Sequence, residues 1–188
     1  MFYHASPVKN IAVLEPRISN HGKAQVYFSE KRENVLVYLS NAVEKYCKEQ
    51  GYDHQGPYRK WASYGFTKEG ILRLEEYYPN ATEETYKGVS GWIYWADKLD
   101  QGERLEGIPF VWISSEPVAV SGCTYIPDAY EAIMEAVREG KMVLKRYEDC
   151  TESNLRWIRD SARQEYAQAE NSPEYRLFLK AKFGDLLD

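Results

Sequence analysis

The sequence predicts an α+β domain with a mixed β-sheet, and three observations support this fold class. A chain of 188 residues fits one domain. With 44% hydrophobic and 28% charged residues, its composition is that of a globular protein with a sizeable core. Strand-like segments gather in the first two thirds and helices close the chain, without the strict alternation of a doubly wound parallel sheet. We expect a single domain, with the core over residues 1–148 and a helical extension over 150–188.

The first 51 residues are predicted to form three strands, a turn and a helix. The strands are rich in aromatic and β-branched residues, and the first two end at prolines. A cluster of Ser, Asn, His and Gly over 19–22 predicts a turn. Apolar residues at helical spacing predict a helix over 30–50, ended by Gly51. The predicted strands are Met1–Ser6, Ile11–Leu14 and Gln25–Ser29.

The middle of the chain is predicted to be mostly strands. Residues 52–66 are aromatic but show no period, so no element is predicted there. Asn80 with Glu83 three residues later predicts the cap of one short helix. Apolar runs predict strands at Ile71–Leu74, Gly91–Trp95, Pro109–Ile113, Pro117–Val120 and Lys141–Tyr147.

Three helices are predicted after residue 125, and the first of them is amphipathic. The first spans Ile126–Glu139, with Pro127 in its first turn, and ends at Gly140. Thr151 caps the second, which reaches about Ala169. The third begins at Ser172-Pro173-Glu174.

Charge and cysteine content narrow the class of protein. The net charge is −5, and no basic stripe typical of nucleic-acid binding is present. Residues 1–60 carry a net +3, which suits a phosphate-bearing small ligand but is equally typical of a solvated surface. No apolar run approaches the ~20 residues that span a bilayer, and no signal peptide opens the chain. Three cysteines without a CxxC pair predict a reducing cytoplasm.

Several common catalytic motifs are absent from the sequence. There is no P-loop, no G-x-G-x-x-G after a strand and no G-x-S-x-G elbow. The three histidines have no metal-ligand spacing, so we expect no metal site.

Four separated features form an ordered set. Tyr3-His4-Ala5-Ser6 lies in the first strand, and Tyr27-Phe28-Ser29 lies where a strand leads into a helix. Tyr38 follows Tyr27 by eleven residues, and Glu116 precedes a late strand. In content and order this set resembles the ADP-ribosyltransferase superfamily, in its His-Tyr-Glu branch of diphtheria-toxin-like and poly(ADP-ribose) polymerase-like domains.

The resemblance implies a split mixed sheet and a site for NAD, used as a substrate without a metal. It implies that His4 binds the adenosine-side ribose, that Ala5 and Ser6 flank the nicotinamide, and that Tyr27 and Tyr38 enclose the nicotinamide ring. Glu116 is the implied catalytic residue, because a fixed carboxylate stabilises the positive charge that develops on the ribose. Two positions depart from the pattern. Ala5 replaces a glycine, and Val35 replaces a serine found in polymerase-like members.

The function implied is NAD cleavage, as mono-ADP-ribosyl transfer to an unidentified acceptor or as hydrolysis. Ala5 and Val35 favour an alternative, a catalytically silent binding or regulatory module of the same fold. An RNA 2′-phosphotransferase would need basic residues near the pocket, and the sequence offers only Arg17 and Arg32. His4 also fits a strand histidine bonded to a carbonyl, and Glu116 fits an exposed turn residue. Core packing would likewise account for both tyrosines.

Overall fold

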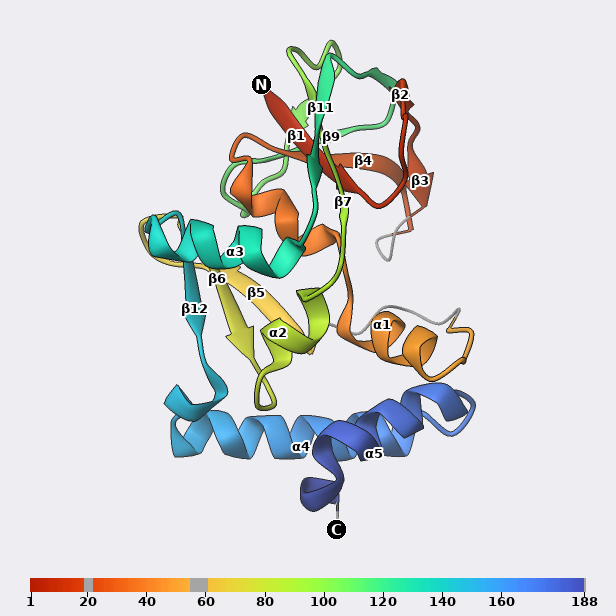
Figure 1. Cartoon of the computed structure of the whole chain (residues 1–188), viewed down its shortest axis with the longest axis vertical. Helices are drawn as coiled ribbons and strands as arrows, with labels where there is room; N and C mark the ends of the chain where they lie inside the picture. The colour runs from red at the N-terminus through yellow and green to blue at the C-terminus, as the bar shows by residue number, and fades with distance from the viewer. Residues whose placement is uncertain (19–21, 55–60, 188) are drawn as a thin grey trace. The chain divides into compact units, whose positions relative to one another are not determined.

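The computed structural model describes residues 1–18, 22–54 and 61–187, and the turn predicted over 19–22 lies mostly outside them. The structure contains several β-sheets together with α-helices, which confirms the α+β class (Figure 1). The chain forms two compact units. The first comprises Met1–Leu39, Phe66–Leu72 and Tyr86–Val143, and the second comprises Ser40–Gly65, Arg73–Thr85 and Leu144–Asp188.

The first unit contains a seven-stranded sheet in the order β11-β7-β1-β4-β9-β8, with β3 also paired to β4. Neighbouring strands in this sheet run antiparallel. A separate two-stranded ribbon joins β2 (Val13–Leu14) to β10 (Val118–Ala119). The strands of the large sheet are β1 (Phe2–Ser6), β3 (Arg17–Ile18), β4 (Ala24–Ser29), β7 (Gly91–Ala96), β8 (Glu103–Arg104), β9 (Val111–Ser114) and β11 (Gly122–Ile126).

The pairing between β1 and β4 is short. Strand β1 pairs with β7 along its whole length, from Phe2 to Ser6. With β4, by contrast, it pairs at Tyr3 and Ser29, near the beginning of β1 and at the end of β4. The backbone ladder between these two strands is therefore interrupted from His4 onward, and we call this interruption the opening between β1 and β4.

Apolar residues cover one face of this sheet, and helical elements pack against its strands. On one face, Phe28 and Tyr94 pack with the ribbon residues Leu14 and Val118. The 3₁₀ helix η1 (Glu33–Tyr38) packs against β1 and β4, and α3 (Ala129–Arg138) packs against η1. These contacts fix the strands that carry the predicted site residues.

The helix predicted over 30–50 is wrong as one element, because the chain breaks it in two. The 3₁₀ helix ends at Tyr38, and α1 begins at Ala42 and ends at Glu49. Between them Asn41 is extended, with φ −135°, and its Oδ1 accepts hydrogen bonds from the N–H groups of Val43 and Glu44. A residue with these properties starts a new helix.

Two other predicted helix starts need correction. Ile126 belongs to β11, where it pairs with Gly91, so α3 begins only at Ala129 and is capped by Asp128. The short helix α2 (Ala81–Tyr86) exists, but Asn80 has φ +58°, outside the extended region of an N-cap. The sequence analysis did not predict β3, β8 or β11.

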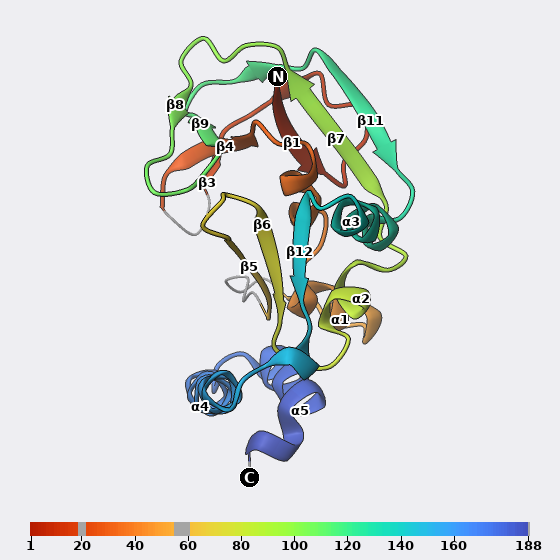
Figure 2. The ribbon, with the colours of Figure 1, turned by 90° about the vertical axis from the view of Figure 1, so that its left-hand side faces the viewer.

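The second unit has a three-stranded sheet in the order β12-β6-β5. Its strands are β5 (Ala62–Phe66), β6 (Leu72–Glu76) and β12 (Met142–Lys145). The last residue of β5 and the first residues of β6 and β12 belong to the first unit. The arrows of β6 and β12 point the same way in Figure 2, and that of β5 points the opposite way, so this sheet is mixed. The large sheet of the first unit is antiparallel, which differs from the mixed core sheet expected from the sequence. Strand β5 lies within the stretch 52–66 for which no element was predicted.

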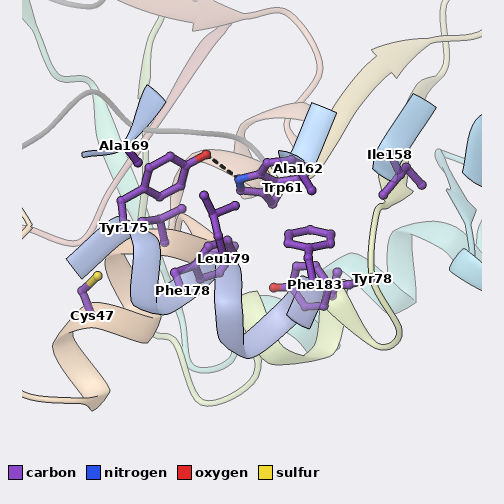
Figure 3. Packing of buried hydrophobic residues seen from close by; sticks show 13 residues of the cluster. Cys47, Trp61, Tyr78, Ile158, Ala162, Ala169, Tyr175, Phe178, Leu179 and Phe183 are labelled. Carbon is purple, nitrogen blue, oxygen red and sulfur yellow. Dashed lines mark hydrogen bonds between the residues drawn. The ribbon is translucent and has the colours of Figure 1, made fainter. Parts of the chain in front are cut away.

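The terminal helices build the core of this second unit. Thr151 caps α4 (Glu152–Gln168) as predicted, and α5 (Pro173–Leu187) begins at the predicted proline. Helix α5 packs against both α4 and α1. In Figure 3 the α5 side chains Tyr175 and Phe183 lie beside Trp61, whose Nε1–H donates to the Tyr175 hydroxyl at 2.9 Å. The cluster comprises Ala42, Val43, Cys47, Trp61, Tyr78, Ala81, Ile158, Ala162, Ala169, Tyr175, Phe178, Leu179 and Phe183.

Candidate functional site

His4 lies on β1 beside the opening in the large sheet. Its Nδ1 is 2.9 Å from the main-chain carbonyl oxygen of Tyr27 on β4. A carbonyl oxygen only accepts, so Nδ1 carries the proton, and the Nε2 atom of the neutral ring is an acceptor. Burial lowers the pKa of His4; the hydrogen bond to Tyr27 opposes this effect, and the positive charge of Arg17 adds to it. Because its pKa is lowered from the usual value, the imidazole of His4 is neutral at pH 7.

Ala5 and Ser6 follow His4 on the same strand. Extending the register of Tyr3 and Ser29 by two residues places Ala5 opposite Tyr27, beyond the end of the β1–β4 ladder. The side chain of Ala5 is buried, and its backbone pairs with Ile93 across β7. The Ser6 hydroxyl accepts a hydrogen bond from the Val8 N–H at 3.2 Å and so supports the turn after the strand.

Tyr27 and Arg17 lie on one face of the sheet. The Tyr27 hydroxyl donates to Oε1 of Gln25 at 3.2 Å. Gln25 pairs with Arg17 across β3, and residues directly opposite in antiparallel strands, or two apart in one strand, share a face. The Arg17 side chain is exposed, and no carboxylate forms an ion pair with it among the described residues.

Tyr38 and Val35 differ in exposure although both lie on η1. Tyr38 is the last residue of the helix and 44% of its surface is exposed. Val35 is 1% exposed, so its side chain belongs to the core. A serine at position 35 would not reach a ligand in this conformation, whereas the ring of Tyr38 is accessible to one.

Glu116 lies in the bend between β9 and β10. The Ser114 hydroxyl fixes this bend by accepting from the Glu116 N–H at 3.2 Å and donating to the Glu116 carbonyl at 2.8 Å. Glu116 lines a surface pocket of about 220 Å³ together with Ile113 and Glu103. Ile113 pairs with Tyr27 on β4 and with Glu103 on β8, so the pocket adjoins the row of residues that contains Tyr27.

The structure brings some of the predicted residues together and not others. His4 contacts the backbone of Tyr27, and Tyr27 is linked to the Glu116 pocket through Ile113. Strand alternation, however, places the His4 ring on the face of Phe28, whose ring centroid is 6.0 Å away, opposite the face of the Tyr27 ring. No hydrogen bond or ion pair joins Glu116 to His4 in the described part of the chain.

The contact of Gln25 with Tyr27 and the place of Glu103 in the pocket lining were not predicted from the sequence. Arg17 was considered only as one of two basic residues. The alternation of β4 would have placed Gln25 beside Tyr27. The position of Glu103 could not be predicted from strand alternation, because β8 has only two residues.

No family model, curated protein or solved structure matches this chain. Among residues 1–18, 22–54 and 61–187, no group of three or more His, Cys, Asp or Glu side chains is arranged to hold a metal ion. None of the helices in those ranges is both long and apolar enough to cross a bilayer.

Proposed function

We propose that the protein binds NAD at the opening between β1 and β4 and cleaves its nicotinamide–ribose bond. The observation that carries this proposal is the interrupted pairing of these strands, across which His4 contacts the carbonyl of Tyr27. An interrupted ladder leaves main-chain N–H and C=O groups directed toward a ligand. The proposal draws its choice of ligand from the resemblance to the ADP-ribosyltransferases.

The nicotinamide would lie at the end of the opening near Ala5. Its carboxamide both donates and accepts hydrogen bonds, as does the backbone of a strand edge. Tyr27 and Tyr38 would offer aromatic faces to the ring, and such contacts favour offset or edge-to-face geometry. The exposure of Tyr38 is consistent with this role.

The remainder of the dinucleotide would use His4 and Arg17. It would have to pass through the opening, because the His4 ring and the Tyr27 ring lie on opposite faces of the sheet. A ribose hydroxyl is a hydrogen-bond donor, which suits the acceptor Nε2 of a neutral His4. Arg17 is close enough to His4 for its positive charge to lower the His4 pKa. A pyrophosphate beside the ribose at His4 would therefore lie in a positive electrostatic field. Arg17 lowers the pKa of His4 and thereby helps to keep it neutral.

Glu116 would stabilise the reacting ribose. The bond between C1′ and the nicotinamide nitrogen breaks, its electron pair stays on that nitrogen, and positive charge develops over C1′ and the ring oxygen. A carboxylate near these atoms stabilises the charge. The nucleophile, either water or an acceptor group, then forms a bond to C1′ and loses its proton. The pocket beside Glu116 offers space for this nucleophile.

The runner-up is a silent NAD-binding or regulatory module. Two observations favour it: Val35 is buried where polymerase-like members carry a serine, and Ala5 adds a side chain where they carry glycine. Ala5 lies beside the proposed position of the nicotinamide, and the buried Val35 supplies no polar contact to it. Neither departure affects the position of Glu116.

Calorimetric titration with NAD, combined with measurement of nicotinamide release, tests the proposal. Heat of binding together with release supports the enzyme, and binding without release supports the silent module. Absence of both overturns the proposal. Arg17→Ala should weaken NAD binding, whereas the control Lys98→Ala, at an exposed ion pair with Asp100, should not.

A further inference from the structure

We propose that the second unit binds a small aromatic carboxylate in a pocket formed by β6, the end of β12 and α4. This inference is independent of NAD binding. The pocket has a volume of about 240 Å³, below the range of about 300–1,000 Å³ that drug-sized ligands occupy. Its lining residues are Glu75, Glu76, Tyr77, Lys145, Cys150, Asn154, Trp157 and Ile158.

The charged residues of the pocket leave one positive charge uncompensated. Glu75 forms an ion pair with Arg73 at 2.7 Å. The Glu76 carboxylate is fully buried and lies 3.5 Å from Arg146. Lys145 alone lacks an acidic partner in the described residues.

Lys145 is held at the pocket by a neutral side chain. Its Nζ donates to Oδ1 of Asn154 at 3.1 Å, and the Thr151 hydroxyl donates to the same oxygen at 2.8 Å. One donor of the ammonium group is thus occupied, and two remain for a ligand. A carboxylate would accept from the ammonium, and such charge-assisted bonds are among the stronger ones.

Two aromatic rings form another part of the lining. Trp157 packs edge-to-face on Tyr77, with ring centroids 5.3 Å apart. Trp157 is nevertheless 54% exposed, although it is the largest side chain lining the pocket. A planar ring in the pocket would cover part of the indole and gain aromatic contacts of the kind seen in aromatic pairs.

The Tyr77 hydroxyl and the Cys150 thiol of the lining are engaged within the protein. The Tyr77 hydroxyl donates to Glu75 at 3.3 Å. The Cys150 thiol is oriented toward the carbonyl oxygens of Glu76 and Arg146, and burial raises its pKa. A thiol with a raised pKa is a weak nucleophile, so the arrangement points to binding and not to covalent chemistry.

The test uses benzoate as the probe and benzyl alcohol as its uncharged counterpart. Titrations of the full-length ¹⁵N-labelled protein at millimolar ligand follow the tryptophan indole N–H resonances. Benzoate should shift the Trp157 resonance, and Lys145→Met should weaken its binding at least about tenfold, since a hydrogen bond to a charged group is lost. Benzyl alcohol should bind more weakly and should be insensitive to that substitution.

Two further variants make the outcome specific. Trp157→Leu, followed through the backbone amide resonance of Asn154, should weaken both ligands, and the exposure of Trp157 allows the exchange without loss of the core. Tyr38→Ala, in the proposed NAD site, should leave benzoate binding unchanged. If benzoate fails to shift the Trp157 resonance, or binds Lys145→Met as tightly as the native protein, the inference is wrong. Neither result bears on NAD binding.

Discussion

The Nδ1–H of His4 and the carbonyl oxygen of Tyr27 lie 2.9 Å apart across the opening between β1 and β4. This hydrogen bond spans the two strands beyond the Tyr3–Ser29 pair, where their backbones no longer pair. It also fixes the tautomer of a buried imidazole, because the carbonyl accepts the Nδ1 proton. The bond therefore connects the stability of the sheet to the protonation of His4.

The first prediction concerns pH. Because the pKa of native His4 is lowered by burial, the unfolded chain binds a proton at acidic pH that the native protein does not. The free energy of unfolding should therefore fall as the pH is lowered through about 6.5, the value in the unfolded chain. Above that pH the contribution of His4 is fully present. Urea unfolding at a series of pH values measures it, and His4→Gln should flatten the curve. Parallel curves would contradict the lowered pKa.

The second prediction concerns Glu116. Glu116→Gln keeps the shape of the side chain but removes its charge, so turnover of NAD should fall about 10²–10³-fold, or roughly 3–4 kcal/mol of barrier. Affinity for NAD should change little, because the charge acts after the bond begins to break. Nicotinamide release and calorimetry measure the two effects. Glu106→Gln, at an exposed loop residue, is the control and should leave both NAD turnover and NAD affinity unchanged. Equal release from all three proteins would remove Glu116 from the mechanism.

The third prediction separates binding from catalysis. Tyr38→Ala removes an exposed ring, and NAD should bind about 2- to 12-fold more weakly, matching the roughly 0.5–1.5 kcal/mol of an aromatic contact. Tyr52 is similarly exposed but belongs to the second unit, so Tyr52→Ala serves as the control. An unchanged dissociation constant for Tyr38→Ala would place the nicotinamide elsewhere.

The fourth prediction concerns the buried carboxylate of Glu76. It accepts hydrogen bonds from the N–H groups of Thr82 and Tyr147, at 3.0 and 3.3 Å. Glu76→Leu would leave both donors without this partner and should lower the free energy of unfolding by about 2–5 kcal/mol. Glu76→Gln, which keeps an acceptor oxygen, should cost less.

Urea unfolding of both Glu76 variants provides the measurement. Glu49→Leu replaces an exposed glutamate that pairs with Lys45, and it should change stability by less than about 1 kcal/mol. A similar loss in Glu49→Leu and Glu76→Leu would show that burial of Glu76 does not matter.

Local sequence signals correctly predicted those helices and strands whose conformation is determined by their own residues. The proline and capping threonine of the last two helices marked their starts, and the aromatic run of β7 marked its strand. The break at Asn41 was missed because apolar spacing continues through it, although its side chain accepts hydrogen bonds from Val43 and Glu44, which follow closely. Strands of two residues, such as β8, carry too little pattern to be predicted.

The candidate site divides in the same way. The sequence by itself determined that a histidine lies in the first strand and a tyrosine in a strand leading to a helix, because alternation and propensity are local. Only the tertiary structure decided that β1 and β4 part after Tyr3, that His4 contacts the carbonyl of Tyr27, and that Val35 is buried. These facts depend on strand register and helix packing, which join residues far apart in the chain and leave no trace in any short stretch of it.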